Sequence, residues 1–534
     1  DEGQLGFGIE ESNYFPPQPV CAPGVALTGA TCGALDERLT GISDVHAAED
    51  TSCARLTGGE VLCWGDNDTF QLGDGTSDDR PSPGPVCLSG TSDGLVCQGG
   101  AALNDSASLF SGEEEGFCVI RTDETALCWG YFSDGPGDGI DESSRNSLRQ
   151  ICRTGSHEAG TAGCLDGATP SPMTEIKTMS LGRTQTCLAV GDVGETLCSG
   201  FGGYGLGRNS FDFDDTFLPE KVCIAGSGPD CTALSATSLG HGDNAGCAIS
   251  PDGIVRCWGD DSASTLGFGN PSTIPYPRPI CEQGIGTECM PLSGVQQVAK
   301  TYLSGCALLD DGEVRCWGAA DYGVLGNGHD RITAPVLELE NQRLCASGIW
   351  NGTACNNGAE STPPLGDFAQ LSAGFRFLCG LTNSGTVYCW GENDDGQVGI
   401  PPATSEVLNP RQVACAFPGS GCEVGQPLSG IASVAAGSFH ACAIHESGDT
   451  WCWGLNNEGQ LGNGNRTSSS SPVPVVSTVP FTQLAPGSLH TCAIGIDRRA
   501  YCWGDDFLGQ LGNGAQAADG SLSPVVVCES GQTE

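Results

Sequence analysis

Basic residues are scarce in this sequence of 534 residues: 22 Lys and Arg stand against 65 Asp and Glu, a formal net charge of −43. A surface with this charge repels phosphate backbones and anionic headgroups, so we expect no nucleic acid partner and no binding to anionic lipid. Long hydrophobic runs are also absent, and none approaches the roughly 18 residues that a membrane-spanning helix needs. We therefore predict no membrane span.

Paired C-x-x-C motifs and long stretches with a helical hydrophobic period are missing as well. Without such motifs the 31 cysteines do not fit metal clusters, so disulfide bonds formed in an oxidising compartment are the simpler interpretation. The chain opens with Asp1 rather than with basic residues followed by an apolar stretch. We interpret it as the mature part of a secreted, extracellular or cell-surface protein.

A repeat is the main feature that is present, in a chain rich in glycine and proline. The segment Cys306–Gly318 has Cys-Trp-Gly at its end, and most copies are followed by a Gly-Gln-Leu-Gly-like element such as 459–464. Successive first cysteines lie about 63 residues apart, which is typical of a unit of several strands. The related segments are Cys53–Gly65, Cys118–Gly130, Cys187–Gly200 (degenerate), Cys247–Gly259, Cys379–Gly391, Cys442–Gly454 and Cys492–Gly504.

Alternating polarity broken by Asp-Gly or Ser-Gly predicts a β-hairpin in each unit. In the unit at 306–316 the two cysteines are symmetric about Asp311, so they would face each other about 4.5 Å apart between Cα atoms. We therefore predict a disulfide bond within each hairpin, with pairing between adjacent units as the alternative. The predicted pairs are Cys53 with Cys63, Cys118 with Cys128, Cys187 with Cys198, Cys247 with Cys257, Cys306 with Cys316, Cys379 with Cys389, Cys442 with Cys452, and Cys492 with Cys502.

The other cysteines lie in the connections between units, where proximity in sequence suggests their partners. Cys528 is left unpaired, and its expected partner would lie beyond Glu534. In the chain-entropy model each short loop closed in this way contributes about 2 to 3 kcal/mol. The expected pairs are Cys21 with Cys32, Cys87 with Cys97, Cys152 with Cys164, Cys223 with Cys231, Cys281 with Cys289, Cys345 with Cys355, and Cys415 with Cys422.

The pattern Gly437-Ser438-Phe439-His440-Ala441-Cys442, followed by Cys452-Trp453-Gly454 and by Gly459-Gln460-Leu461-Gly462, resembles the repeat of the regulator of chromosome condensation family. The resemblance covers nearly the whole chain and implies an all-β fold, a β-propeller of four-stranded blades that usually number seven. The physical reading agrees, because each unit has an apolar face that only its neighbours can cover. The tryptophan would fill the space between neighbouring blades.

The number of units exceeds seven. Residues 1–41 contain the second half of a repeat and a disulfide-linked connection, and residues 42–534 contain eight units. We therefore expect seven or more blades in a ring, with an open array, or one linked to neighbouring chains, as alternatives. The half-repeat and Cys528 favour a window of a longer precursor or one link of an assembly. The expected units are 42–100, 101–172, 173–232, 233–291, 292–362, 363–428, 429–480 and 481–534.

The sequence shows no motif that indicates catalytic residues. Nuclear members of the family exchange guanine nucleotide on a small GTPase and bind nucleosomes through basic segments, which this chain lacks. Only His440 and His490 occupy the family's histidine position, two residues before the first hairpin cysteine. We interpret them as histidines that tether backbone inside a blade rather than as metal ligands or catalysts. No Gly-x-Ser-x-Gly elbow lies between a strand and a helix, so we predict that the protein is not an enzyme.

Acidic turns are the better candidates for ligand binding. Carboxylates on glycine-rich turns suit Ca²⁺, although none matches a twelve-residue calcium loop and solvated turns are the simpler interpretation. We expect no other cofactor. The weak calcium candidates are Asp66, Asp68, Asp134, Asp138, Asp141, Asp394 and Asp395. Sequons, which would fit exposed loops carrying N-linked sugars, occur at Asn67, Asn104, Asn351 and Asn465.

Three functions fit these observations. The first is an extracellular structural or adhesive protein, such as a subunit of a surface appendage or filament, whose partner is a protein or further copies of itself. The second is a secreted propeller that binds and inhibits or regulates another protein, with Tyr131, Phe132, Phe211, Phe213, Trp350 and Phe507 as candidate contact residues. The third, a carbohydrate-active enzyme, needs two carboxylates in one pocket.

Overall fold

The computed structural model describes most of the chain. The described residues are 39–47, 50–92, 96–112, 116–132, 144–154, 164, 171–182, 185–200, 206–207, 216–226, 230–242, 245–261, 266, 268, 274–283, 289–302, 304–329, 342–350, 354–356, 361–400, 405–513 and 517–527. Within them the one helix is the short 3-10 helix η3 (Asp321–Gly323). No helix in this part of the chain is long and apolar enough to cross a bilayer.

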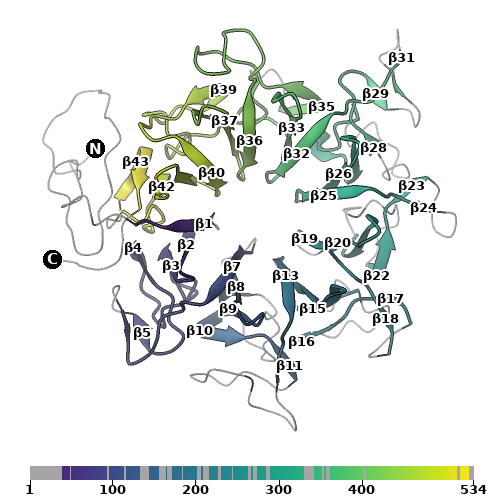
Figure 1. The fold of residues 1–534 in the computed structure, drawn as a ribbon. Helices are drawn as coiled ribbons and strands as arrows, with labels where there is room; N and C mark the ends of the chain where they lie inside the picture. The colour runs from purple at the N-terminus through teal and green to yellow at the C-terminus, as the bar shows by residue number, and fades with distance from the viewer. Residues whose placement is uncertain are drawn as a thin grey trace, which may run out of the picture.

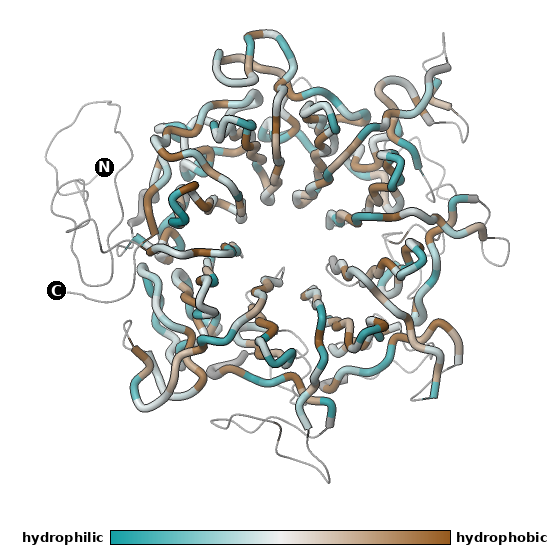
Figure 2. Tube along the Cα trace, viewed as in Figure 1, coloured by the Kyte–Doolittle hydropathy of each residue, from teal (hydrophilic) through white to brown (hydrophobic). Residues whose placement is uncertain are grey.

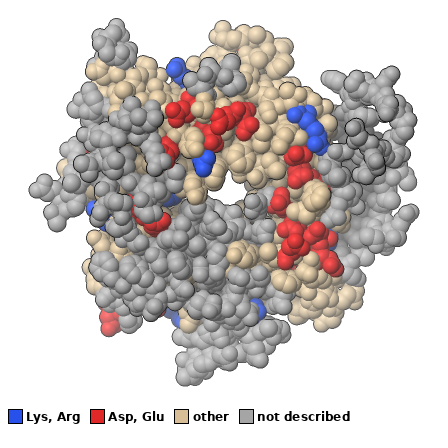
Figure 3. Space-filling view, turned by 180° about the vertical axis from the view of Figure 1, so that it is seen from behind, with Lys and Arg blue, Asp and Glu red and all other residues tan. Residues whose placement is uncertain are grey.

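Eight antiparallel sheets of four strands follow one another along the chain and form a ring (Figure 1), and the space-filling view shows a central channel through it (Figure 3). In each sheet the strands pair in sequence order, and the first strand lies nearest the channel. The blades are β1 (Ile42–Ala47), β2 (Thr51–Leu56), β3 (Val61–Gly65), β4 (Arg80–Pro85); β7 (Ser106–Ser111), β8 (Gly116–Arg121), β9 (Ala126–Tyr131), β10 (Ser144–Gln150); β13 (Ile176–Leu181), β14 (Gln185–Val190), β15 (Glu195–Gly200), β16 (Thr216–Lys221); β19 (Ser238–Gly242), β20 (Ala245–Ile249), β21 (Val255–Gly259), β22 (Ile274–Pro279); β25 (Val295–Lys300), β26 (Ser304–Leu309), β27 (Val314–Gly318), β28 (Gln342–Arg343); β32 (Phe368–Ala373), β33 (Phe377–Thr382), β34 (Val387–Glu392), β35 (Glu406–Gln412); β36 (Ile431–Ala436), β37 (His440–His445), β38 (Thr450–Gly454), β39 (Ser469–Pro474); and β40 (Phe481–Pro486), β41 (His490–Gly495), β42 (Ala500–Asp506), β43 (Ala517–Val526).

Small sheets lie on the perimeter, in the connections that lead from one blade to the next (Figure 1). They are β5 (Thr91–Ser92) with β6 (Cys97–Gln98), β11 (Cys152–Thr154) with β12 (Ser171–Pro172), β17 (Cys223–Ala225) with β18 (Thr232–Ala233), β23 (Cys281–Gln283) with β24 (Met290–Pro291), and β29 (Ile349–Trp350) with β30 (Cys355–Asn356) and β31 (Ser361–Thr362).

The disulfide bonds follow from the hairpin register. Cys306 lies directly opposite Cys316 on β26 and β27, and their Cα atoms are 4.1 Å apart. All eight hairpins contain such a bond, and six connections contain the bond expected for them. None of these bonds joins two blades, so the alternative of pairing between adjacent units is wrong for these cysteines. Cys21, Cys32 and Cys528 lie outside the described residues.

The hydrophobic core lies between successive blades rather than in a single centre. One cluster, for example, combines Leu308 and Val314 of one blade with Leu371 and Trp390 of the next. The indole N–H of Trp390 donates to the carbonyl of Val324 in the preceding blade at 2.8 Å, so the tryptophan both fills this space and fixes the adjacent loop. Figure 2 shows the corresponding hydrophobic segments along the strands of every blade.

The glycine of the Cys-Trp-Gly element is required by the backbone. Gly454 has a φ of +109°, a backbone conformation that residues other than glycine rarely adopt. A Cβ at this position would also lie 2.6 Å from the carbonyl oxygen of Phe439 and 2.8 Å from the Cα of His440. The end of the third strand therefore packs directly against the loop between the first two strands.

The ring closes between its last and first blades with contacts of the type found elsewhere in the ring. Trp64 of β3 donates its indole N–H to the carbonyl of Gln510 at 2.8 Å, as Trp453 does to Gln397 at 2.9 Å. One hydrophobic cluster contains residues of both blades, including Ile42 and Phe481. The protein is thus a closed propeller of eight blades, and the alternative of an open array is wrong.

Proline occupies one register position of the outermost strand in most blades. This position directly precedes the residue that faces the second hairpin cysteine, for example Gly84, which faces Cys63. Because proline cannot donate to a further strand, these edges are protected from pairing with another chain. The prolines at this position are Pro83, Pro219, Pro277, Pro410, Pro472 and Pro524.

Candidate functional site

The loops between the first and second strands of the last four blades line one mouth of the central channel. Backbone hydrogen bonds link each loop to the next: Tyr302 N to Phe375 O at 3.0 Å, Phe375 N to Ser438 O at 3.4 Å, and Ser438 N to Gly487 O at 3.2 Å. These bonds hold four loops that are distant in sequence in one continuous arc. We call this set of loops the rim.

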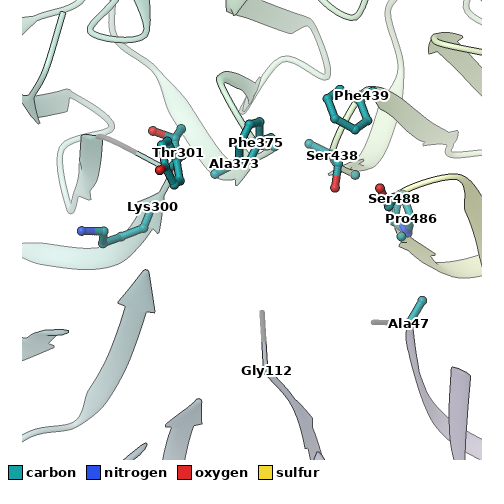
Figure 4. A pocket seen from close by; sticks show the side chains of 15 residues that line it. Ala47, Gly112, Lys300, Thr301, Ala373, Phe375, Ser438, Phe439, Pro486 and Ser488 are labelled. Carbon is teal, nitrogen blue, oxygen red and sulfur yellow. The ribbon is translucent and has the colours of Figure 1, made fainter. Parts of the chain in front are cut away.

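The rim borders a cavity of about 490 Å³ that opens into the channel. Figure 4 shows Thr301, Ala373, Ser438 and Ser488 around the opening, so its wall carries small side chains and hydroxyl groups. Among the described lining residues, Lys300 is the charged one, and no carboxylate is present. The lining residues are Ala47, Gly112, Lys300, Thr301, Tyr302, Ala373, Gly374, Phe375, Ala436, Gly437, Ser438, Phe439, Pro486, Gly487 and Ser488.

Three aromatic side chains of the rim form a stripe. The ring centroids of Tyr302 and Phe375 are 5.0 Å apart, and those of Phe375 and Phe439 are 6.1 Å apart. Tyr302 is 40% exposed, and the other two rings are half-buried. Aromatic residues and arginine are enriched where proteins bind other proteins, because they offer a large contact area at a small entropic cost. We call Tyr302, Phe375 and Phe439 the aromatic arc.

The side chain of Arg376 packs against the aromatic arc. Its guanidinium lies 4.8 Å from the ring centroids of both Phe375 and Tyr322, and its Nη1 is 3.5 Å from a carboxylate oxygen of Glu392. Burial raises the pKa of Glu392, an effect that the charge of Arg376 opposes. The arginine is therefore held by two aromatic faces and a carboxylate, which keeps the arc ordered.

The two sequence-predicted histidines lie directly beneath the rim and connect blades. Nε2 of His440 lies 2.7 Å from Oγ1 of Thr491 in the next blade, and that hydroxyl donates to Gln460 O at 3.0 Å. At the ring closure, Nε2 of His490 lies 3.0 Å from Oγ of Ser52. Because Thr491 uses its proton on Gln460, His440 must donate through Nε2–H. The expectation of a tether within one blade is wrong, since the partners are hydroxyl groups of the following blade.

Burial determines the charge of these histidines. It lowers the pKa of His440 to about 3, with a further contribution from the charge of His490, and it lowers the pKa of His490 to about 4. Both imidazoles are therefore neutral near pH 7 and engaged in structure. Among the described residues, neither belongs to a group of carboxylates or cysteines that could hold a metal ion, and the partners of both Nε2 atoms are hydroxyl groups.

Acidic residues gather on two sides of the central opening, as Figure 3 shows for one face. Asp66, Asp68 and Asp79 have carboxylate oxygens within 4.8 Å of one another, a donor set that suits Ca²⁺. However, Asp66 also accepts hydrogen bonds from the Gln71 amide at 2.6 Å and from the Asp68 backbone at 3.3 Å. These bonds give the cluster a structural use without a cation, and calcium binding remains a prediction.

Of the other calcium candidates, the two in the described residues, Asp394 and Asp395, are not part of this cluster. Asp394 is exposed and Asp395 is half-buried on a turn that follows β34. Burial raises the pKa of Asp395, and the charge of Asp394 adds to this effect. Asp134, Asp138 and Asp141 lie outside the described residues.

Asn67 has a structural role that the sequence reasoning missed. Its side chain is fully buried, its Oδ1 accepts from Leu72 N at 3.0 Å, and its Nδ2 donates to Thr76 O at 2.9 Å. The expectation of an exposed glycosylated loop is therefore wrong at Asn67, because the nitrogen that would carry the sugar is buried and bonded. Asn104 and Asn465 are exposed, and Asn351 lies outside the described residues.

The same role recurs at one position of the repeat, four residues after the second hairpin cysteine. Asn456 Oδ1 accepts from Leu461 N at 2.9 Å, and its Nδ2 donates to Asn465 O at 2.8 Å. Asp261 accepts from Leu266 N at 2.8 Å, and burial raises its pKa to about 6. An alignment of the repeats on their cysteines shows Asn or Asp at this position in several units. The residues whose side chains close the loop there are Asn67, Asp261, Asn393, Asn456 and Asp506.

The aromatic residues proposed from the sequence as a contact surface are not the ones found at the rim. Phe132 is 5% exposed, so its expected role in contact is wrong, whereas Phe507 is 65% exposed but lies outside the rim. Tyr131 is half-buried. Phe211, Phe213 and the side chain of Trp350 lie outside the described residues. The sequence alone does not reveal the arc, because its members lie three or four residues before the hairpin cysteines of three different units.

Comparison with known proteins identifies related chains. The profile of the RCC1-like domain matches residues 150–533, which is more than half of the chain. The ultraviolet-B receptor UVR8 of Arabidopsis thaliana is 30% identical over 440 residues, covering 80% of this chain and 80% of that protein. The RCC1-like G exchanging factor-like protein of Mus musculus is 28% identical over 216 residues, covering 39% of this chain and 40% of that protein.

Solved structures share the fold at lower sequence identity. Human WBSCR16 has a TM-score of 0.53 and 17% identity, covering 82% of this chain and 99% of that one. Yeast RCC1 (Prp20), solved with Kap60, has a TM-score of 0.51 and 18% identity, covering 75% of this chain and 83% of that one. At these identities the similarity concerns the arrangement of blades.

Proposed function

Because the chain belongs to the RCC1-like domain family, we propose that it is a non-enzymatic module that binds another protein through the aromatic arc beside its channel. Binding or regulation of proteins is the common activity suggested by its relatives. The observation that carries the proposal is the partly exposed arc of Tyr302, Phe375 and Phe439, held in place by Arg376 and by backbone bonds between loops. Such a preformed apolar surface loses little entropy when it is covered.

The disulfide bonds support an oxidising compartment as the place of action. Fourteen bonds of this kind are rare in proteins kept reduced by glutathione. Secretion or display on the cell surface is therefore part of the proposal, although one relative is described as mitochondrial. The net charge of −43 disfavours nucleic acid and favours a protein partner with a basic surface.

Site-specific photo-crosslinking tests the proposal. A photoreactive phenylalanine analogue at position 302 should crosslink to one discrete protein in the extracellular fraction of the native source. The same analogue at position 276 is the matched control, since Tyr276 is similarly exposed, at 39%, but lies on the outer strand β22. Equal products at both positions, or products at 276 alone, would contradict binding through the arc.

A structural or adhesive role, including assembly of copies into a filament, is the second candidate. It is supported by exposed apolar side chains on the disulfide-linked perimeter connections, which are Val96, Ile224, Met290, Ile349, Phe417 and Val424. Sedimentation of the purified protein distinguishes the two candidates. Concentration-dependent growth that is abolished by replacing these residues with serine supports assembly, and a monomer at all concentrations rejects it.

A further inference from the structure

A turn rich in carboxylates lies beside the aromatic arc. It comprises residues 392–396, at the end of β34 and the start of the loop that follows, and it contains Glu392, Asp394 and Asp395. The backbone N–H of Glu392 donates to the carbonyl of Arg376 at 2.9 Å, which ties the turn to the rim. Loops after the third strand of a blade lie at the same end of the strands as the loops of the rim. The turn and the arc therefore share one face of the ring, and we call residues 392–396 the acidic turn.

The carboxylates of the acidic turn outnumber the basic groups around them. Nη1 of Arg376 lies 3.5 Å from a carboxylate oxygen of Glu392, which is longer than the roughly 2.7 to 2.9 Å of a charge-assisted hydrogen bond. Asp394 and Asp395 form no ion pair with any described lysine or arginine. Three carboxylates therefore share one guanidinium, and the turn carries an excess of negative charge.

Repulsion within the acidic turn affects its titration. Burial raises the pKa of Glu392 and that of Asp395, and in both cases the charges of neighbouring carboxylates add to the shift. At Glu392 the charge of Arg376 opposes the shift without cancelling it. A positive group placed over the turn would relieve this repulsion, since an opposite charge at close range favours the ionised carboxylate.

The corresponding loop of another blade uses its carboxylate internally. In the first blade, Gln71 donates its amide N–H to Asp66 at 2.6 Å. Glu392 and Gln397 occupy the same two positions of the repeat, but Nε2 of Gln397 has no hydrogen-bond partner among the described residues. Glu392 is directed toward Arg376 instead. The first carboxylate of the acidic turn is therefore oriented toward the rim and not toward the interior of its own loop.

An apolar surface adjoins the acidic turn on the side of the channel. The aromatic arc borders the cavity of about 490 Å³, and Figure 4 shows Phe375 and Phe439 beside the opening. The acidic turn leads away from it to the outermost strand β35. Lys300, the charged residue among the described lining residues, ends the innermost strand β25 of the preceding blade. A segment that enters the cavity and leaves over the acidic turn would therefore place its basic residues away from Lys300.

We propose that the rim binds a segment of its partner in which a large apolar side chain is flanked by lysine or arginine. This inference rests on the proposed function and specifies the chemistry of the partner. The apolar side chain would occupy the cavity against the aromatic arc, and a basic side chain would lie over the acidic turn. Aromatic contacts of this kind supply most of the affinity, whereas complementary charge speeds association and selects among partners.

Titration of the intact protein with three defined peptides tests this chemistry. We expect saturable binding of acetyl-Gly-Lys-Trp-Lys-Gly-amide, and at least about fivefold weaker binding of acetyl-Gly-Glu-Trp-Glu-Gly-amide and of acetyl-Gly-Lys-Gly-Lys-Gly-amide. Equal binding of the two lysine peptides would mean that the acidic chain attracts any cation. Equal binding of the two tryptophan peptides would mean that charge plays no part. Either result, or no saturable binding of the first peptide, would overturn the proposal.

Two double substitutions that remove the same charge locate the site. Asp394→Asn with Asp395→Asn should weaken binding of the lysine–tryptophan peptide about fivefold or more. The matched change, Asp310→Asn with Asp311→Asn, alters two exposed residues of the hairpin turn between β26 and β27, on the opposite face of the ring. It should leave the affinity within about twofold, because solvent and salt screen charges at that distance. Equal losses in both variants would contradict a role for the acidic turn.

Photo-crosslinking from position 302 separates this inference from the proposed function. A crosslink that weakens in the acidic-turn variant and persists in the hairpin variant supports both. A crosslink whose yield is unchanged in the acidic-turn variant overturns the present inference alone and leaves binding through the arc intact. A wild-type protein that gives no crosslink contradicts the proposed function, and the peptide titrations then decide the inference separately.

Discussion

At the scale of single residues, the molecule depends on polar side chains that are buried inside its loops. Asn456 is the clearest case, because one side chain satisfies a backbone N–H and two carbonyl groups, those of Asn465 and Thr467. The side chain of Asn456 is fully buried. The loop that follows the third strand is therefore stabilised by an amide rather than by hydrophobic contact.

Replacing this amide should be costly. We expect Asn456→Ala to lower the free energy of unfolding by about 2 to 3 kcal/mol, since it leaves the buried N–H of Leu461 and the partly buried carbonyl groups of Asn465 and Thr467 without this partner. Chemical denaturation with matched Asn104→Ala measures the effect, because Asn104 is exposed and should tolerate the change within about 0.5 kcal/mol. Similar losses for both variants would contradict the assigned role.

His490 should make stability depend on pH. Its pKa is about 4 in the folded protein against 6.5 for the ordinary group, so the unfolded chain binds the proton first as the pH falls. Its contribution is present above pH 6.5 and is lost between about pH 6.5 and 4, by an amount on the order of 3 kcal/mol. Unfolding curves of wild type and His490→Gln over this range measure it, and parallel pH profiles would show that the imidazole is not responsible.

At the scale of elements, the hairpin and the connection use disulfide bonds differently. Cys306 and Cys316 are fully buried within the core between two blades, whereas the bond between Cys281 and Cys289 lies in a perimeter connection. The hairpin bond therefore fills space as well as restricting the unfolded chain. The outermost strands rely on proline instead, and this argues against assembly by pairing of sheet edges.

Removing the two kinds of bond should separate these contributions. Chain entropy predicts about 2 to 3 kcal/mol for either, because the loops are of similar length. The double change Cys306→Ala, Cys316→Ala also leaves a cavity, so we expect it to cost at least about 1 kcal/mol more than Cys281→Ala, Cys289→Ala. Urea denaturation measures both, and equal losses would mean that packing of the sulfur atoms adds nothing.

These elements are the part of the structure that the sequence predicts best. Hairpin pairing depends on local spacing, as for Cys306 and Cys316 around Asp311, and local spacing is visible in a single chain. The partners of His440 and the members of the aromatic arc are not visible in this way, because Thr491, Tyr302 and Phe375 come from different units. Their contacts depend on how blades are rotated against each other, which no local pattern records.

At the scale of the whole molecule, the excess of acidic residues opposes the compact state. A net charge of −43 on one chain produces self-repulsion that salt screens.

The number of blades is also a property of the whole molecule. Eight units can be counted in the sequence, but the ring closes only if the last blade fits against the first. The contact between His490 and Ser52 shows that it does.

Salt should therefore stabilise the protein. We expect the melting temperature to rise as ionic strength increases from about 0.01 M to about 0.15 M, because the Debye length falls from about 30 Å to about 8 Å. Calcium chloride at equal ionic strength is the second arm. A larger rise with calcium that Asp68→Asn removes would identify the cluster of Asp66, Asp68 and Asp79 as a cation site, and identical rises with both salts would reject it.

The junction made by Trp64 with Gln510 and by Ser52 with His490 repeats the bonding found at the junction of Trp503 and Thr491 with Gln460. Because the contacts between the last and first blades resemble those between other neighbouring blades, no particular blade has to come first in the chain. A circular permutant that begins at a different blade, with the original termini joined by a linker, should fold into the same ring. The contacts between neighbouring blades matter more here than the blade at which the chain begins.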